Sequence, residues 1–443
     1  MTRPDLTGLH AELIELLGER GVSTDLGTRQ RASVDGCPMS PILSAQLPLG
    51  LADLVAYPSS AEEIGQVVAA AYRHDVPVTP RGKGTANYGQ GLPLHDGLVL
   101  DTTRARRVLE VGDGWITAEA GAVIAMMEAA ARQSGQELLM YPSTAQSTIA
   151  GFLSGGSGGT GSIEHGTISS SDFVQALDVV EMTGSPELVH ITGDDIQTYL
   201  HTYGTVGIIA KVTVKLEPLR DWRCFYASFE EFQPALDLIR VFGDMEPSPR
   251  LMSADRPLMV NALPLHPGLP RDRVSLRGIV RADEVARASR LVEEVGGRVD
   301  AVIDDAQEMI RMSMMSYNHT IEWTQKAYPD TYFHVELVGQ ALIDRVDEVE
   351  AVYPGGVLHI EAQKDRPLGL LVGEFESAEA VYAGYEKYAE MGVFVHSPHQ
   401  WTVDNNPGRA MARAARSDPK GLLNPGKLVE GAVVNQVMTT DNS

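Results

Sequence analysis

Residues 151–166 read GFLSGGSGGTGSIEHG and contain the pattern G-x-G-x-x-G at Gly156, Gly158 and Gly161, with the acidic residue Glu181 further along the chain. In a nucleotide-binding βαβ unit such glycines follow a strand and open a helix whose N-terminus binds the pyrophosphate. Here the residues before the glycines predict a short helix, and the polar residues after them predict no crossover helix. The context argues against that fold and favours another kind of phosphate-binding loop.

A second glycine-rich loop, RGKGTANYGQG, spans Arg81–Gly91. Successive backbone N–H groups in such loops can form a concave site for an anion, because glycine adopts backbone angles that other residues avoid. Either loop alone could be an ordinary surface turn. Two of them in one strand-rich region favour a ligand with an extended phosphate group, held from two sides.

Composition narrows the function classes. The chain has 443 residues and a formal net charge of −23, which argues against a nucleic-acid partner. Two cysteines, Cys37 and Cys224, are too few for a disulfide framework or a zinc site. The N-terminus lacks the pattern of a signal peptide, and no apolar run is long enough to cross a bilayer. We therefore expect a cytoplasmic protein with a small-molecule substrate and no membrane partner.

The order of the expected elements predicts two domains and an α+β fold. Residues 1–219 alternate short strands, helices and a hairpin turn at 112–114, and residues 400–443 are expected to return to this first domain. Residues 220–399 read as a second unit, in which an antiparallel sheet is covered by helices.

Four blocks carry a resemblance to a known family: residues 57–85, 147–174, 203–216 and 418–428. In content and order they resemble the FAD-binding domain of the vanillyl-alcohol oxidase / p-cresol methylhydroxylase superfamily, and the chain looks like a glycolate- or D-lactate-oxidase-like FAD-linked oxidoreductase. The resemblance implies the two-subdomain FAD-binding fold of that superfamily and a second domain that covers the flavin as a cap. Dimers are common among such proteins, so a homodimer is expected as well.

The resemblance also implies which residues hold FAD, with the pyrophosphate between the two glycine loops. These residues are Pro80, Arg81, Gly82, Lys83, Gly84, Thr85, Pro142, Ser143, Thr144, Ser147, Thr148, Gly151, Gly156, Ser157, Gly159, Gly161, Ser162, Gly166, Ile208, Asn424 and Lys427. Several relatives have a histidine that binds the flavin covalently where this chain has Thr85, so non-covalent FAD is expected. His399, followed by Asp404, is the alternative attachment point, as in the alcohol-oxidase branch.

The cap strands suggest where the substrate binds. In TYFHVELVG, residues 331–339, period-two alternation places His334 and Glu336 on one face. In GVLHIEAQ, residues 356–363, the same rule places His359 and Glu361 together. These faces are either directed at the flavin or solvated. A third interpretation is a divalent metal held by His334, His359 and Glu336, since imidazole and carboxylate suit zinc, manganese or iron.

The expected chemistry is transfer of a hydride from an alcohol or 2-hydroxy acid to flavin N5, with a base accepting the hydroxyl proton. His396 and His399 are candidate bases, because an unperturbed histidine titrates near neutral pH. Tyr317, in a predicted helix with Asn318 and His319, and Arg250, a candidate clamp for a substrate carboxylate, complete the set. The alternatives are a phenolic alcohol oxidase with covalent flavin, a non-redox flavin enzyme resembling alkyl-dihydroxyacetonephosphate synthase, and a flavin-binding protein without catalysis.

Overall fold

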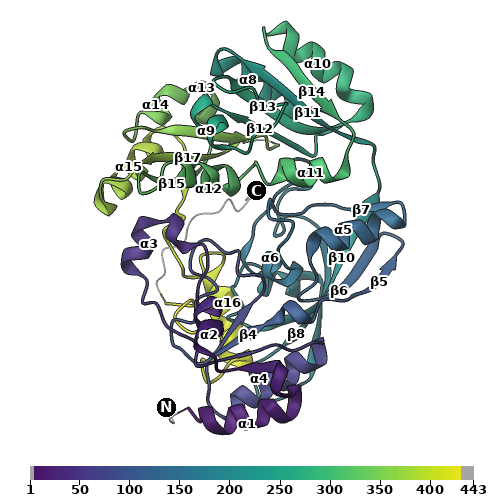
Figure 1. Ribbon diagram of the computed structural model, residues 1–443, viewed down its shortest axis with the longest axis vertical. Coiled ribbons are helices and arrows are strands. Elements are labelled where there is room, and N and C mark those ends of the chain that lie inside the picture. The colour runs from purple at the N-terminus through teal and green to yellow at the C-terminus, as the bar shows by residue number, and fades with distance from the viewer. Residues whose placement is uncertain (1–3, 365, 431–443) are drawn as a thin grey trace.

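The computed structural model describes residues 4–364 and 366–430. Three sheets form two units, which follow one another along the long axis (Figure 1). The lower unit contains two sheets from the N-terminal half together with the C-terminal helix, and the upper unit, the cap, contains the third sheet. The predicted α+β architecture and the antiparallel cap sheet are confirmed.

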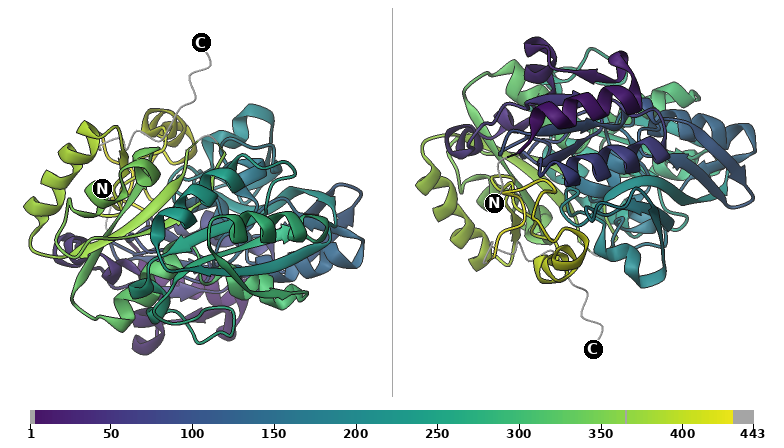
Figure 2. Two further views of the ribbon diagram at one scale, coloured as in Figure 1. Left: turned by 90° about the horizontal axis from the view of Figure 1, so that it is seen from above. Right: turned by 90° about the horizontal axis from the view of Figure 1, so that it is seen from below.

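The first sheet is small and lies next to the N-terminal helices, which face the viewer when the molecule is seen from below (Figure 2). Its central strands are parallel, and β1 is antiparallel to β2 at one edge. The strands, in spatial order, are β1 Val22–Ser23, β2 Leu54–Ala56, β4 Leu98–Asp101 and β3 Val78–Arg81. The helices of this part are α1 Leu6–Leu17, α2 Leu26–Ala32, α3 Pro41–Gln46 and α4 Ala61–Arg73.

Helix α4 illustrates how the sequence sets these elements. The Ser60 hydroxyl caps it by accepting a hydrogen bond from the backbone N–H of Glu63 at 3.2 Å. Ile64, Val67 and Val68 then recur at helical spacing and are fully buried. One face of α4 is therefore part of the core shared by the two sheets of the lower unit.

The second sheet is antiparallel throughout. Its strands are β5 Val108–Gly112, β6 Trp115–Glu119, β10 Ile208–Pro218, β8 Val174–Val180 and β9 Leu188–Thr192 in spatial order, with β7 Gln136–Leu138 paired to the end of β10. Its helices are α5 Ile124–Gln133, α6 Ile149–Gly155 and α7 Ser162–His165. Helix α7 after Gly161 has only 4 residues and is too short to be a crossover helix, so the prediction that no crossover helix follows the glycines is confirmed.

The cap sheet has the strand order β14-β11-β13-β12-β16-β17-β15-β18. Its strands are β11 Trp222–Phe229, β12 Leu251–Asp255, β13 Val274–Arg281, β14 Arg298–Ile303, β15 Tyr332–Val338, β16 Val357–Glu361, β17 Leu368–Glu374 and β18 Phe394–His396. The helices are α8 Phe232–Gly243, α9 Pro257–Ala262, α10 Val285–Glu294, α11 Ala306–Ser313, α12 Asn318–Ala327, α13 Ala341–Asp344, α14 Val346–Glu350 and α15 Ala378–Glu390.

The two faces of the cap sheet differ. Helices α8, α10, α14 and α15 bury an apolar core on the outer face. Helices α9, α11 and α12 cover the inner face, and α11 and α12 lie between the cap sheet and the lower unit (Figure 1). The inner face is the one that borders the functional site.

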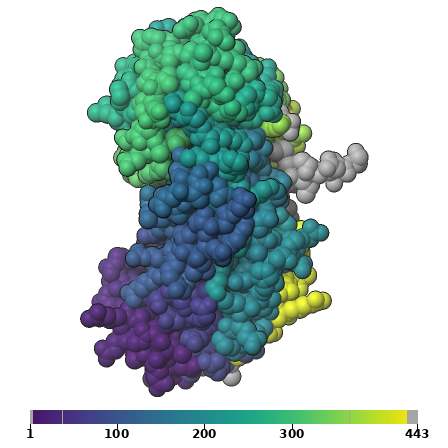
Figure 3. All heavy atoms as spheres, turned by 90° about the vertical axis from the view of Figure 1, so that its right-hand side faces the viewer, coloured from purple at the N-terminus to yellow at the C-terminus, as the bar shows by residue number. Residues whose placement is uncertain are grey.

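The C-terminal part of the chain returns to the lower unit. Helix α16, Pro407–Ser417, is followed by a segment that extends the first sheet: the backbone N–H of Val78 donates to the carbonyl of Leu422, and the N–H of Asn424 donates to the carbonyl of Val78, both at 2.8 Å. In the space-filling view the cap, the second sheet and the N-terminal part follow one another from top to bottom (Figure 3). Within residues 4–364 and 366–430, none of the helices is long and apolar enough to traverse a lipid bilayer.

Candidate functional site

A cavity of about 1160 Å³ lies between the glycine loops of the lower unit and the inner face of the cap. Both loops identified in the sequence line it, as do α12, β15, β17 and β18 of the cap. The cavity therefore has one wall rich in glycine and backbone groups, and another built from cap side chains.

Of the residues expected to hold FAD, most line this cavity. They are Pro80, Arg81, Gly82, Lys83, Gly84, Thr85, Pro142, Ser143, Thr144, Ser147, Thr148, Gly151, Gly156, Ser157, Gly159, Ser162, Gly166 and Ile208. Gly161, Asn424 and Lys427 are not part of the lining. Asn424 Nδ2 donates to the carbonyls of Gln90 and Tyr203, and Lys427 Nζ donates to the carbonyl of Gly89, so these two side chains hold the lining loops from behind.

The first loop fits a phosphate group because it leaves no room for side chains. A Cβ atom on Gly82 would lie 2.1 Å from Thr148 Oγ1, and Gly84 has a φ of +69°, which favours glycine. Thr148 Oγ1 is buried and has no hydrogen-bond partner among the described residues. Since a buried hydroxyl without a partner costs free energy, this atom is suited to bind a ligand oxygen. The loop and Thr148 thus fit a bound pyrophosphate.

The six predicted catalytic residues fall into two groups, according to whether they line the cavity. His396 and Tyr317 line the cavity, whereas His334, His359, His399 and Arg250 do not. His399 is only 4% exposed, and its Nδ1 lies 2.7 Å from the hydroxyl oxygen of Ser40. Burial lowers the pKa of His399 to about 3 and that of His334 to about 4, so both rings are neutral near pH 7.

Arg250 does not reach the cavity either. Its guanidinium donates to Glu137 Oε2 at 2.9 Å and to the carbonyl of Leu138 at 2.6 Å, and the residue is 3% exposed. Glu137 and Leu138 of the lower unit thus bind its two terminal nitrogens, and Arg250 joins the cap to the lower unit. A buried pair of this kind leaves no guanidinium for a substrate.

His359 belongs to a buried cluster inside the cap. Its Nδ1 donates to Asp255 Oδ1 at 2.7 Å and its Nε2 donates to Glu361 Oε1 at 2.8 Å, while Arg277 pairs with the other oxygen of Asp255. Burial opposes the charged ring, but the Asp255 carboxylate prevails and raises the pKa of His359 to about 9. The backbone N–H of Tyr317 donates to Glu361 Oε1 at 2.8 Å, so this cluster also fixes the start of α12.

Glu336 is the centre of a second cluster, which faces the cavity. Tyr88 Oη donates to Glu336 Oε1 at 2.6 Å, and His396 Nδ1 donates to Glu336 Oε2 at 2.8 Å. His396 Nε2 in turn donates to Asp404 Oδ2 at 3.2 Å, and Asn318 Nδ2 donates to Tyr88 Oη at 3.0 Å. All five residues line the cavity.

The same cluster continues into the lower unit through His201. Its Nδ1 lies 2.9 Å from the carbonyl oxygen of Gly156, which can only accept, so Nδ1 carries a proton. Its Nε2 lies 3.2 Å from Tyr203 Oη and 3.6 Å from Asp404 Oδ1. His201 and Tyr203 have φ values of +53° and +55°, a strained conformation for such residues and one that clusters at functional sites.

Charges in this second cluster follow from its hydrogen bonds. Both ring nitrogens of His396 face carboxylate oxygens, which only accept, so the ring is an imidazolium. Burial opposes that charge, but Glu336 and Asp404 outweigh it and raise the pKa of His396 to about 10. Burial likewise opposes ionisation of Glu336, but His396 and Tyr88 lower its pKa to about 2, and the histidines lower that of Asp404. His396, Glu336 and Asp404 thus carry one positive and two negative charges between them.

The structure does not gather the three residues considered for a metal. Strand β17 lies between β15 and β16, and its Leu370 separates Glu336 from His359 while Val372 is opposite His334. In the described part of the chain, the one group with metal-ligand spacing is Glu164, His165 and Glu217, and Arg220 already pairs with both of its carboxylates.

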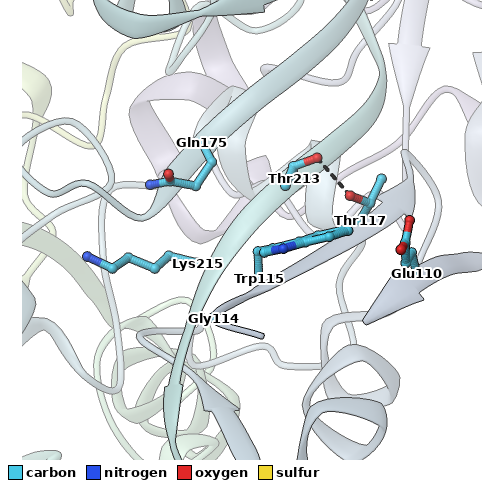
Figure 4. A pocket seen from close by; sticks show the side chains of 7 residues that line it. All are labelled: Glu110, Gly114, Trp115, Thr117, Gln175, Thr213 and Lys215. Carbon is cyan, nitrogen blue, oxygen red and sulfur yellow. Dashed lines mark hydrogen bonds between the residues drawn. The ribbon is translucent and has the colours of Figure 1, made fainter. Parts of the chain in front are cut away.

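A second, open hollow lies on the exposed face of the second sheet. It is about 470 Å³ in volume. Figure 4 shows Trp115 with Lys215 and Gln175 to one side and Glu110 to the other, and the hydroxyls of Thr117 and Thr213 joined by a hydrogen bond of 2.8 Å. Its side chains come from neighbouring strands of one sheet, and it contains none of the residues discussed above.

Sequence reasoning missed Tyr88, His201 and Tyr203, and it identified Asp404 only as a neighbour of His399. Two signals were present. Tyr88 follows the phosphate-binding positions within the first glycine loop, and His201 lies two residues before Tyr203, the first residue of the block 203–216. Neither signal shows that Tyr88 meets Glu336, 248 positions away, or that His201 lies beside Asp404.

Comparison with known proteins agrees with the geometry. A family model described as an FAD binding domain matches residues 52–189. An uncharacterised FAD-linked oxidoreductase of Mycobacterium tuberculosis is 29% identical over 199 residues, which are 42% of this chain and 43% of that protein. The glycolate oxidase subunit GlcD of Bacillus subtilis is 31% identical over 38% of this chain and 37% of its own length. Each match therefore spans less than half of the relative.

Solved structures share the whole fold. An alkyldihydroxyacetonephosphate synthase superposes with a TM-score of 0.76 at 16% identity, over 96% of this chain and 86% of that one. The 4-ethylphenol oxidase from Gulosibacter chungangensis superposes with a TM-score of 0.66 at 16% identity, over 96% and 98%. Residues 52–189 are therefore an FAD binding domain, within a chain that shares the fold of these two solved structures.

Proposed function

We propose that the protein is an FAD-linked oxidoreductase that oxidises the alcohol carbon of a small substrate, either an alcohol or a 2-hydroxy acid. Relatives named D-lactate dehydrogenase and glycolate oxidase support this class of reaction. FAD bound along the glycine loops would accept the hydride. The observation that carries the proposal is the position of the Glu336 carboxylate, which lines the same cavity as both glycine loops.

Glu336 is the proposed proton acceptor. The hydroxyl proton of an alcohol becomes strongly acidic as the hydride leaves its carbon, so a carboxylate suffices to take it. Tyr88 and His396 donate to the two oxygens of Glu336 at 2.6 and 2.8 Å and so fix the orientation of the carboxylate. Its side chain keeps 19% of its surface exposed because it faces the cavity.

His396 has a different role from that of a base, which the sequence predicted. An imidazolium has no lone pair with which to accept a proton, and the pKa of about 10 keeps this ring protonated at neutral pH. We therefore assign it the role of orienting and charge-balancing Glu336, and Asp404 holds it from the other side at 3.2 Å.

The flavin is proposed to be non-covalent. Thr85 lies in the first loop where relatives with covalent flavin have a histidine, and His399 is not part of the cavity lining. Acid precipitation of the purified protein checks this, because free FAD stays in the supernatant and leaves a colourless pellet. A yellow pellet would contradict the proposal.

The proposed function is tested by adding alcohols and 2-hydroxy acids to the purified flavoprotein without oxygen and recording the flavin absorbance. Bleaching of the flavin band by a member of either class is the expected result. The likeness of the fold to alkyldihydroxyacetonephosphate synthase favours a non-redox flavin enzyme as the second candidate. A flavin that no alcohol or hydroxy acid bleaches would favour that candidate.

A further inference from the structure

The cap wall of the cavity carries a strip of apolar side chains beside Glu336. In the sheet register Val338 is opposite both Leu368 and Phe394, and Glu336 is opposite Leu370, so these side chains point to one face. All of them line the cavity, and Phe394 is 44% exposed. Apolar surface that faces an open cavity is suited to an apolar ligand.

The charges around this strip do not favour an anion. Glu336 and Asp404 are both ionised, and the two histidine rings beside them, His396 and His201, are directed at these carboxylates, so the cluster has no cation left to bind an anion. A negative charge brought next to the Glu336 carboxylate is repelled strongly, because the partly buried site is poorly screened. A substrate carboxylate next to Glu336 would meet this repulsion.

The lysines and arginines of the cavity do not offset this repulsion of a substrate carboxylate. Among the described lining residues, the lysines and arginines are Arg81, Lys83, Lys364 and Arg366. Arg81 donates to the backbone carbonyls of the N-terminal segment, and Lys83 is exposed on the phosphate-binding loop. The remaining two are exposed: Lys364 pairs with Glu246 at 3.2 Å, and the Arg366 guanidinium lies 5.6 Å from the centre of the Phe394 ring. Exposed charges of this kind are screened by water and salt.

We infer that the substrate is a neutral, largely apolar alcohol, rather than a 2-hydroxy acid like those named for the relatives. Its hydrocarbon part lies against Val338, Leu368, Leu370 and Phe394, and its hydroxyl lies at Glu336. This inference rests on the proposed function, since it names the substrate class of the same site.

The first test is binding of two ligands that differ only in charge. Benzamide and benzoate have the same shape, and neither can be oxidised at an alcohol carbon, so each can be titrated into the flavoprotein and followed by the change in flavin absorbance. Benzamide should bind about tenfold more tightly or better, as expected for a close like charge in a poorly screened site. Tighter binding of benzoate, or no binding of either, overturns the inference.

The second test is oxidation of matched pairs. Benzyl alcohol and 1-hexanol should reduce the flavin faster than mandelate and 2-hydroxyhexanoate, with oxygen excluded. Faster reduction by the hydroxy acids overturns the inference and leaves the proposed function intact. If nothing reduces the flavin while benzamide still binds more tightly than benzoate, the proposed function fails and the neutral character of the site stands.

A variant pair checks that the cap strip sets the preference. Leu368 is half-buried, so Leu368→Arg can be accommodated, and it should move the preference towards benzoate by tenfold or more. Leu368→Met, of similar volume and no charge, should keep the preference for benzamide. The flavin spectrum of each variant shows that the protein is folded and loaded, and an unchanged preference in a folded, loaded L368R protein would contradict the inference.

Discussion

Strands β15 and β16 carry the same His-x-Glu pattern on the same face of the cap sheet, yet the two glutamates serve different ends. Glu361 is 0% exposed and bonds His359 inside the cap, whereas Glu336 faces the cavity and bonds His396 from β18. His359 and His396 are each an imidazolium between two carboxylates. Access to the cavity, rather than the residues themselves, distinguishes a structural cluster from a candidate catalytic one.

The largest expected effect on stability comes from removing Arg277, the arginine of the buried cluster around His359. Arg277→Met leaves the ionised Asp255 buried beside a single cation, and removing one partner of a buried pair costs about 3–5 kcal/mol. We expect the free energy of unfolding, measured by denaturant titration, to fall by that amount. Arg281→Met on the same strand is the control, because its side chain is 37% exposed and its partner Asp283 is 62% exposed, so its loss should cost less than about 0.5 kcal/mol. Equal effects of the two variants would show that the buried cluster does not stabilise the cap.

Glu336→Gln should affect the rate of flavin reduction more than stability, which is the reverse of the effect of Arg277→Met. Loss of the proposed proton acceptor should slow anaerobic flavin reduction about 100-fold or more. The thermal midpoint should also fall, because His396 loses one of its two carboxylate partners, but by less than in Glu361→Gln, whose carboxylate is fully buried. Glu361→Gln is the matched change in the His-x-Glu pattern of β16. It should lower the thermal midpoint, and the protein that stays folded should lose much less of its rate of flavin reduction. If E361Q slows reduction as strongly as E336Q, without loss of flavin, the division between the two clusters is wrong.

The pH dependence of flavin reduction sharpens the assignment of the proton acceptor. Glu336 has a pKa of about 2 and His396 a pKa of about 10, so the active charge pattern persists between them. We expect the rate at saturating substrate to be flat from about pH 5 to about pH 9. A histidine base of ordinary pKa would instead give a rate that falls below about pH 6.5. Stopped-flow reduction across this range decides between them, and a fall of that kind would restore a histidine as the base.

How much of this site the sequence predicts depends on the range of the contacts. Glycine positions in the two loops and the alternation of His334 with Glu336 are local properties. Both loops line the cavity, and the two side chains lie on one face of β15, as the sequence predicts. Which polar groups of the cap reach the cavity depends on strand order: β17 separates β15 from β16, and β18 brings His396 beside Glu336. His399, three residues beyond His396, is instead buried against Ser40. Such long-range pairing leaves no periodic signal in a single sequence.

The smallest expected effect is a loss of stability at alkaline pH. Its dependence on pH shows how much the cluster around His359 and the cluster around Glu336 each contribute. The pKa of His396 is raised to about 10 and that of His359 to about 9, both above the ordinary value of about 6.5. A histidine whose pKa is raised by folding stabilises the protein fully below its ordinary pKa, and that contribution is lost as the pH rises through the folded value. The thermal midpoint of the flavoprotein should therefore fall between about pH 6.5 and about pH 10.

His396→Gln measures how much of that fall in the thermal midpoint comes from the cluster around Glu336. Without the imidazolium, Glu336 and Asp404 repel one another, so the variant should be less stable than the parent near pH 7, and the difference should shrink as the pH rises towards 10 because the parent loses its own charge there. The decline that remains in the variant belongs to His359, whose carboxylate partners are unchanged. Thermal midpoints of both proteins at matched ionic strength measure the two shares. A difference that stays constant over this range would mean that His396 is neutral in the folded protein, and the charge pattern assigned to the cavity would then be wrong.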